Sequence, residues 1–136
     1  MIASNEDLEG HLTRLNRSFE RADDADVFLI SMGPGQPPCA LNISPPVLVA
    51  QVRVADAPSS DDAASARFMR RLLEINASGL LHAAFAIESG QIVLTAALEL
   101  QNLDTNELEA VLSDLDMALA EHVPVLVSLS KGVSLG

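Results

Sequence analysis

LLHAAFAIESGQIVLTAALEL (80–100) is the stretch that decides the fold, and it predicts a β-hairpin. Apolar residues alternate on both sides of Ser89-Gly90, so one face of each strand is more apolar than the other, as in a half-buried antiparallel pair. Glycine at the second turn position can adopt the positive φ that a tight two-residue connection requires. In the first strand the more apolar set begins at Leu81, which puts His82 and Ala84 on the opposite face.

A helix is predicted on the N-terminal side of this hairpin. Phe68, Leu72 and Ile75 recur at helical spacing in RFMRRLLEIN, so their side chains form its buried stripe. Serines after a proline are a common helix start, and we therefore expect this helix to open at Ser59 or Ser60.

The clearest helix start follows the hairpin, in LDTNELEAVLSDLDMALAEH (103–122). Asp104 can accept hydrogen bonds from the free amides of the first turn, and Glu107 completes a capping box three residues later. The apolar stripe of an amphipathic helix follows: Leu108, Val111, Leu112, Leu115 and Leu119. Pro124 predicts where this helix stops.

A further helix is predicted near the N-terminus. Ser4 and Asp7 make a plausible capping pair for its first turn. The polar residues at 22–26 predict its end. Four apolar residues recur between these limits at helical spacing: Leu8, Leu12, Leu15 and Phe19.

Three strands are predicted between the first two helices. Short apolar runs at 27–32, 39–43 and 47–54 are separated by turn residues, and the last run is rich in β-branched side chains. The glycines and prolines at 33–38 cannot continue a ladder, so they form a loop. The element order is helix, three strands, helix, two strands, helix. It predicts an α+β fold, with helices packed on an antiparallel sheet.

The chain length and cysteine count fit one small domain. We expect residues 1–123 of the 136 to form a single domain and residues 124–136 an unassigned tail. No basic and apolar leader precedes residue 20, and the single cysteine fits a reducing compartment. We therefore expect a cytoplasmic protein.

The net charge of −11 excludes two classes of partner from the prediction. Nucleic acid and anionic membranes are bound through clustered Lys and Arg, whereas Lys131 is the only Lys or Arg after Arg71. An acidic surface usually serves solubility, and less often attracts a basic partner segment.

No motif predicts catalysis or a bound cofactor. Cys39 has no CxxC partner, the three histidines lack a zinc-ligand spacing, and the glycines at 33 and 35 are followed by prolines instead of a helix. The arginines at 67, 70 and 71 could bind an anion, but such side chains more often pair with nearby acids. The prediction is a protein that is not an enzyme, with no catalytic, metal or cofactor-binding residues.

The element order and three motifs resemble the class I type III secretion chaperones and the related YbjN-type bacterial domains. RRLLEINA (70–77) is similar to their leucine-rich helix ending in an L-N motif. LHAAFAIESGQIVLTAAL (81–98) resembles their strand, glycine turn and second strand, and ELQNLDTNELEAVLSDL (99–115) resembles the segment that leads into their last helix.

This resemblance implies a binding function. Chaperones of this family are homodimers that hold an extended segment of a secreted protein against apolar patches. On this chain the implied client contacts are Leu12, Val47 and Val49. The implied dimer interface contains Phe68, Leu72, His82 and Ala84.

Two other functions remain open at this stage. A YbjN-like regulatory or stress-associated domain would keep the fold but have no secreted client. A small enzyme or ligand-binding domain would assemble its site only in three dimensions, as a convergent polar pocket.

Overall fold

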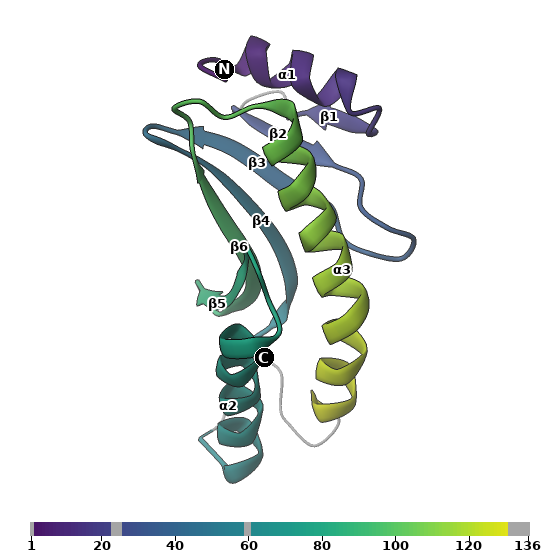
Figure 1. Ribbon diagram of the computed structural model, residues 1–136. Helices are drawn as coiled ribbons and strands as arrows, with labels where there is room; N and C mark the ends of the chain where they lie inside the picture. Colours follow the sequence, from purple (N-terminus) through teal and green to yellow (C-terminus); the bar gives the residue numbers. More distant parts are fainter. Residues whose placement is uncertain (1, 23–25, 59–60, 131–136) are drawn as a thin grey trace.

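The computed structural model describes residues 2–22, 26–58 and 61–130 and consists of one curved sheet and three helices (Figure 1). The helices are α1 (Asn5–Arg14), α2 (Ala63–Ser78) and α3 (Thr105–Ser130). The strands are β1 (Phe19–Arg21), β2 (Val27–Ile30), β3 (Cys39–Ser44), β4 (Val47–Asp56), β5 (Ala84–Glu88) and β6 (Gln91–Glu99). Among the described residues, no helix is both long and apolar enough to cross a membrane.

The six strands form a single antiparallel sheet in the order β1-β2-β3-β4-β6-β5. The first four strands follow one another along the chain. After α2, β5 takes the outer position and β6 returns beside β4. The sheet edges are therefore β1 at one end and β5 at the other. The α+β class and the antiparallel sheet are confirmed.

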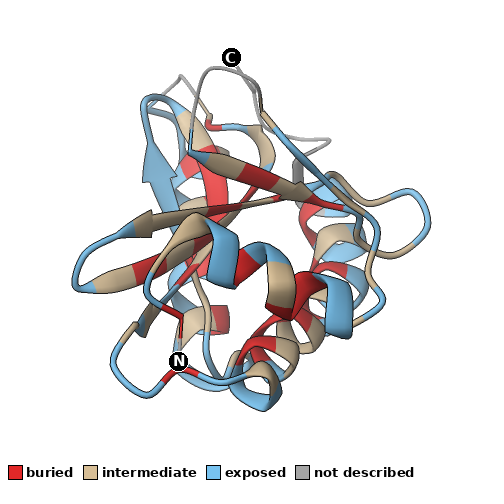
Figure 2. Cartoon of the chain, turned by 90° about the horizontal axis from the view of Figure 1, so that it is seen from above, coloured by how far each residue is buried: buried red, intermediate tan, exposed pale blue. Residues whose placement is uncertain are grey.

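All three helices pack on one face of the sheet, and the core lies between them. Leu12 of α1, Phe68 of α2 and Leu112 of α3 belong to one buried cluster with Leu41 and Leu94 of the sheet. Figure 2 shows the buried residues gathered where helices and strands face each other. Among the residues that the structure describes, none forms a helix on the opposite face of the sheet (Figure 1).

The hairpin and the start of α3 form as their sequences predict. Ser89 and Gly90 both adopt positive φ, at 51° and 75°, as a two-residue turn requires. The Asp104 carboxylate accepts a hydrogen bond of 2.8 Å from the Glu107 amide. The predicted apolar stripe of this helix is completely buried, including Leu112 at 0% exposure.

The prediction that the first helix reaches residues 22–26 was wrong. The helix ends at Arg14, Asn16 adopts a φ of 59° that turns the chain, and Phe19 begins strand β1. The Phe19 ring packs against Phe28 with centroids 6.0 Å apart. Phe19 is therefore apolar because it packs against the core from a strand, and its match to the helical spacing is a coincidence.

The prediction that the last helix stops at Pro124 was also wrong, because α3 continues to Ser130 with the proline inside it. Leu126, which lies seven residues or about two turns beyond Leu119, is still buried. Burial of this continuing stripe supports the helix beyond the proline, which lacks an amide hydrogen.

Two other boundaries differ. Strand β5 begins at Ala84, so His82 lies in a bend and Leu81 is 85% exposed, outside the alternating pattern. The N-cap of α2 is Asp62, whose carboxylate accepts a hydrogen bond from the Ser65 amide. The predicted start at residues 59 and 60 lies outside the described residues.

Candidate functional site

The helix-free face of the sheet is the candidate functional surface. Strand alternation directs Leu48, Ala50 and Val52 of β4 into the core, and therefore directs the intervening β4 residues to the other face. Neighbouring strands contribute Leu29, Ala40 and Val93 to the same side through their register. This face combines small and branched apolar side chains with isolated polar ones.

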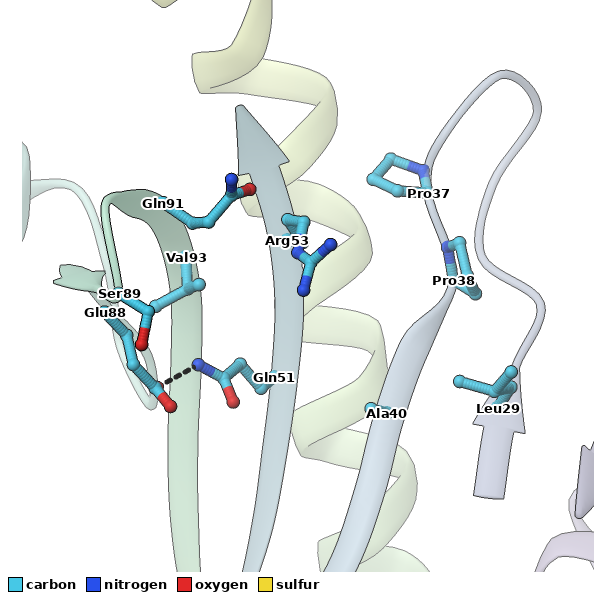
Figure 3. A pocket seen from close by; sticks show the side chains of 10 residues that line it. All are labelled: Leu29, Pro37, Pro38, Ala40, Gln51, Arg53, Glu88, Ser89, Gln91 and Val93. Carbon is cyan, nitrogen blue, oxygen red and sulfur yellow. Dashed lines mark hydrogen bonds between the residues drawn. The ribbon is translucent and has the colours of Figure 1, made fainter. Parts of the chain in front are cut away.

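Part of this face is hollowed into a groove of about 540 Å³, which we call the sheet groove (Figure 3). Its apolar surface comes from Leu29, Pro37, Pro38, Ala40 and Val93. The two prolines belong to the loop between β2 and β3, and they form one side of the groove beside the strands. A second hollow of about 270 Å³ shares Leu29 and Pro38 with the sheet groove and extends past Phe19 and Glu20 of β1.

The far end of the sheet groove, near the β5–β6 turn, is polar. Gln51 Nε2 donates to Glu88 Oε2 at 2.6 Å (Figure 3), and Gln91 Nε2 donates to Asp56 Oδ1 at 2.6 Å. Arg53 is exposed and lies beside Val93 in the strand register. The groove therefore offers apolar contacts at one end and amide, carboxylate and guanidinium groups at the other.

The outer edge of β1 is open to main-chain hydrogen bonding. The Ser18 carbonyl accepts a hydrogen bond from the Ser31 amide, and the Ala22 amide donates to the Val27 carbonyl, each at 2.9 Å. Ser18 and Ala22 therefore direct their main-chain groups toward β2. Alternation therefore directs the amide and carbonyl groups of Phe19 and Arg21 away from β2. Within the described part of the chain, these four groups have no hydrogen-bond partner.

The outer edge of β5 is different, because the side chain of Asn76 covers it. The Phe85 amide donates to Asn76 Oδ1 at 2.7 Å, and Asn76 Nδ2 donates to the Phe85 carbonyl at 3.0 Å. The amide side chain thus takes the place of a neighbouring strand at this residue. Asn76 belongs to the last turn of α2, so the same contact joins this helix to the sheet edge.

A set of charged contacts holds the β1 end of the molecule to α3. The Arg17 guanidinium is 3.2 Å from both the Glu109 and the Asp116 carboxylates. Asp116 also accepts a hydrogen bond of 3.0 Å from the Gly33 amide. Hydrogen bonds from Arg17, and then from Ser113, lower the pKa of Glu109.

The potentially reactive side chains lie away from the sheet groove. Cys39 faces the core, where burial raises the pKa of its thiol to about 12. His11 is buried against Thr105, and His122 is buried 3.3 Å from the Gly79 carbonyl. The described residues contain no cluster of His, Cys, Asp or Glu suited to a metal ion.

The structure distributes the seven sequence-predicted site residues over three environments. Leu12, Phe68 and Leu72 lie in the core with 0%, 3% and 5% exposure, so they offer a partner almost no surface. Val47 and Val49 lie half-buried on the helix-free face, on the same side of β4 as Gln51 and Arg53 but outside the sheet groove.

The remaining two predicted residues lie where α2 leads into β5. His82 is exposed, its amide donates to Asp114 at 2.9 Å and its ring Nδ1 is 3.5 Å from the same carboxylate. Ala84 is half-buried and pairs with Thr95 on the helix-free face. Nearby elements expose three large apolar side chains that the sequence prediction missed: Leu73, Leu81 and Ile87.

Solved structures similar to this chain include proteins of bacterial secretion systems. A chain of the heterodimeric ExoU–SpcU complex from the type III secretion system of Pseudomonas aeruginosa has a TM-score of 0.64 and 19% identity; the match covers 86% of this chain and 95% of that one. YbjN from E. coli has a TM-score of 0.67 and 15% identity, over 99% and 97% of the two chains.

A third structure is the Yersinia pestis type III secretion chaperone SycH in complex with a fragment of YscM2. Its TM-score is 0.54 at 19% identity, with 90% of this chain and 96% of that one covered. At these identities the likeness establishes the fold. No curated protein matches by sequence. The CesT_Tir_1 family model matches residues 1–132, almost the whole chain, and the protein therefore belongs to this family of type III secretion chaperones.

Proposed function

We propose that this protein is a non-enzymatic, chaperone-like binding protein that holds an extended segment of a partner protein and works as a cytoplasmic homodimer. The observation that carries the proposal is the open edge of β1 beside the hollowed, helix-free face. An edge strand provides main-chain hydrogen bonds, and an adjoining apolar surface receives alternate side chains of the added strand.

The geometry of the β1 edge suits one short added strand. The free groups of Phe19 and Arg21 supply two donors and two acceptors, spaced as in an antiparallel or parallel ladder. The smaller hollow borders Phe19 and Glu20 and continues into the sheet groove through Leu29 and Pro38. A segment that leaves the edge can therefore continue over apolar surface without crossing a helix.

The similar solved structures support a protein partner. ExoU–SpcU is a heterodimer, SycH is a chaperone in complex with a fragment of YscM2, and HopA1–SchA is a chaperone–effector complex. Transfer of that role to this chain is part of the proposal. Val47 and Val49, which extend the apolar character of the helix-free face beyond the sheet groove, remain candidate client contacts.

We place the homodimer contact on the flank formed by α2, β5 and their connection. Leu73, Leu81 and Ile87 are 69%, 85% and 51% exposed there. Large apolar side chains exposed on consecutive elements are typical of an interface. His82 follows Leu81 in the connection and Ala84 begins β5; these two are the predicted interface residues with surface to contribute, whereas Phe68 and Leu72 support this flank from the core.

The test is capture of partners from the native host by the tagged protein and by two variants at one position. In Arg21→Pro the outward amide hydrogen is lost, and the ladder with β2 is kept because that amide does not take part in it. Arg21→Ala loses the same side chain, with its Asp26 ion pair, but keeps the amide. We expect a near-stoichiometric partner to bind the unmodified protein and Arg21→Ala, and to be lost from Arg21→Pro.

Equal capture by the alanine and proline variants would contradict strand addition at β1. Absence of any enriched partner would contradict the chaperone-like function itself and favour a YbjN-like regulatory role without a client. Melting curves of both variants are needed beside the capture, so that loss of binding is compared between equally folded proteins.

A further inference from the structure

Asn76 covers the edge of the sheet that faces the proposed dimer flank, and this position has a consequence for how two copies can meet. We propose that Asn76 caps β5 against strand addition by a second copy of this chain, so that copies meet at this flank through side chains only. The inference builds on the proposed homodimer, but its test does not need a client.

The cap occupies half of the main-chain groups that β5 could offer. The hydrogen bonds of Phe85 to Asn76 identify Phe85 as an outward-facing residue, and alternation makes Ile87 the next one. Ala84, Ala86 and Glu88 face β6 in the ladder. With Phe85 occupied, Ile87 is the one outward-facing residue of β5 left to pair, which is too little for a stable strand addition.

The sequence of β5 explains why a cap is needed. Exposed edge strands are usually protected by lysine, proline or a bulge. The segment Ala84–Glu88 is AFAIE, which is apolar up to the residue before the turn and contains none of these devices. The β1 edge, in contrast, carries Glu20 and Arg21.

A second copy of the chain is the partner that fits this edge. Two β5 strands related by a two-fold axis would pair antiparallel, with Phe85 and Ile87 of each copy supplying the outward groups. The exposed Leu73, Leu81 and Ile87 side chains would bring the same flank of two copies together. Asn76 then decides whether that encounter stays a side-chain contact or becomes a continuous sheet.

The experiment compares the molar mass of six proteins by light scattering over a range of concentrations: the unmodified chain, three single variants (Asn76→Leu, Ile87→Pro and Ile87→Ala) and two double variants. Asn76→Leu removes both hydrogen-bonding groups at similar volume, and we expect species of at least twice the unmodified mass to grow with concentration. Adding Ile87→Pro removes an outward amide hydrogen and blocks pairing, so Asn76→Leu/Ile87→Pro should have the mass of Ile87→Pro alone. Asn76→Leu/Ile87→Ala, which loses the same exposed side chain but keeps the amide, should remain larger than Ile87→Ala alone.

Three results would overturn the proposal. The first is an Asn76→Leu protein that is folded and keeps the unmodified mass. The second is equal rescue by Ile87→Ala, which would assign the association to the side chain. The third is a lower mass for Ile87→Pro than for Ile87→Ala, because both lose the side chain and only a strand already paired at this edge would depend on the amide.

A measurement on the unmodified protein covers the case in which Asn76→Leu fails to fold. The Phe85 amide should exchange with solvent at least about tenfold more slowly than the Ile87 amide, the effect of one hydrogen bond of about 1.4 kcal/mol. Similar exchange rates at the two amides would show that the cap is absent in solution and would refute the proposal.

Discussion

The two ends of the sheet are held to the helices by different kinds of contact. At the β1 end, Arg17 joins two carboxylates of α3 that lie more than ninety positions away in the chain. At the β5 end, Asn76 bonds to Phe85 only nine positions away, and apolar packing of α2 surrounds that contact. Ion pairs depend on pH and salt, and neutral amide contacts do not, so the Arg17 contacts make the end with the open edge sensitive to solution conditions.

The largest expected loss of stability comes from disrupting the core that both ends of the sheet share. Leu112 has no exposed surface and contacts the common core through α3, so Leu112→Asp should bury an unpaired carboxylate and cost more than about 4 kcal/mol, enough to unfold the domain. Circular dichroism and thermal melting would measure this. Met117→Asp, on the same helix at 68% exposure, is the control and should change stability by no more than about 0.5 kcal/mol. A cooperative melt for Leu112→Asp at the unmodified temperature would contradict the assignment of this helix face.

Removal of Arg17 should affect one end only. Arg17→Ala leaves the Glu109 and Asp116 carboxylates without their cation; these carboxylates are partly exposed, so we expect a loss of about 1–2 kcal/mol. Hydrogen exchange should accelerate at the Ala22 and Ser31 amides, which bond across the β1–β2 ladder, more than at the Phe85 amide. Arg70→Ala is the control, since its pair with Glu74 is 4.0 Å long and solvent-exposed, and equal effects of the two variants would refute the asymmetry.

Substitutions in the β5–β6 turn, at the opposite end of the sheet, should change the free energy of unfolding less. Gly90 has a φ of 75° and nothing within 4 Å of the position a Cβ would take, so Gly90→Ala suffers only backbone strain, of about 1 kcal/mol. Ser89→Asn should stabilise the protein by a few tenths of a kcal/mol, roughly, because asparagine tolerates the φ of 51° better. Urea unfolding of both variants would measure this, and a destabilised Ser89→Asn would contradict the assigned turn.

Acidification should weaken the β1 end first. Burial, and then the positive charge of Arg14, lower the pKa of His11 below its usual 6.5. Between the folded and unfolded pKa values the unfolded chain binds more protons, so stability is complete above about pH 6.5 and falls as pH decreases. The depressed pKa of Glu109 adds the same trend below its usual 4.5. In His11→Asn, which does not titrate, melting temperature should depend less on pH between 7 and 5; an unchanged dependence would exclude His11 as its source.

Local signals explain why the hairpin and the third helix could be predicted from sequence. The Ser89-Gly90 turn, the Asp104 cap and the spacing of Leu108 and Leu112 each lie within a few residues of the structure they determine. Strand β1 has no such signal. It has three residues, follows the turn at Asn16, and forms because β2 pairs with it.

The candidate site was harder to predict for a related reason. Alternation in β4 places Val47 and Val49 opposite the core, and this could be inferred locally. Leu12, Phe68 and Leu72 share the same apolar periodicity as any core helix, and only the packing of all three helices decides that they are covered. The sheet groove depends on Pro37 and Pro38 lying beside β3 and Val93, a contact between distant parts of the chain.

The unequal edges of the sheet also set a limit on stoichiometry. A sheet with two open edges can propagate, since each added strand leaves another chain able to accept the next, as in a growing fibre. With β5 capped by Asn76, each molecule can take up a strand at its β1 edge but not at its β5 edge. Such a molecule binds one strand and the sheet grows no further, whatever the concentration of partner.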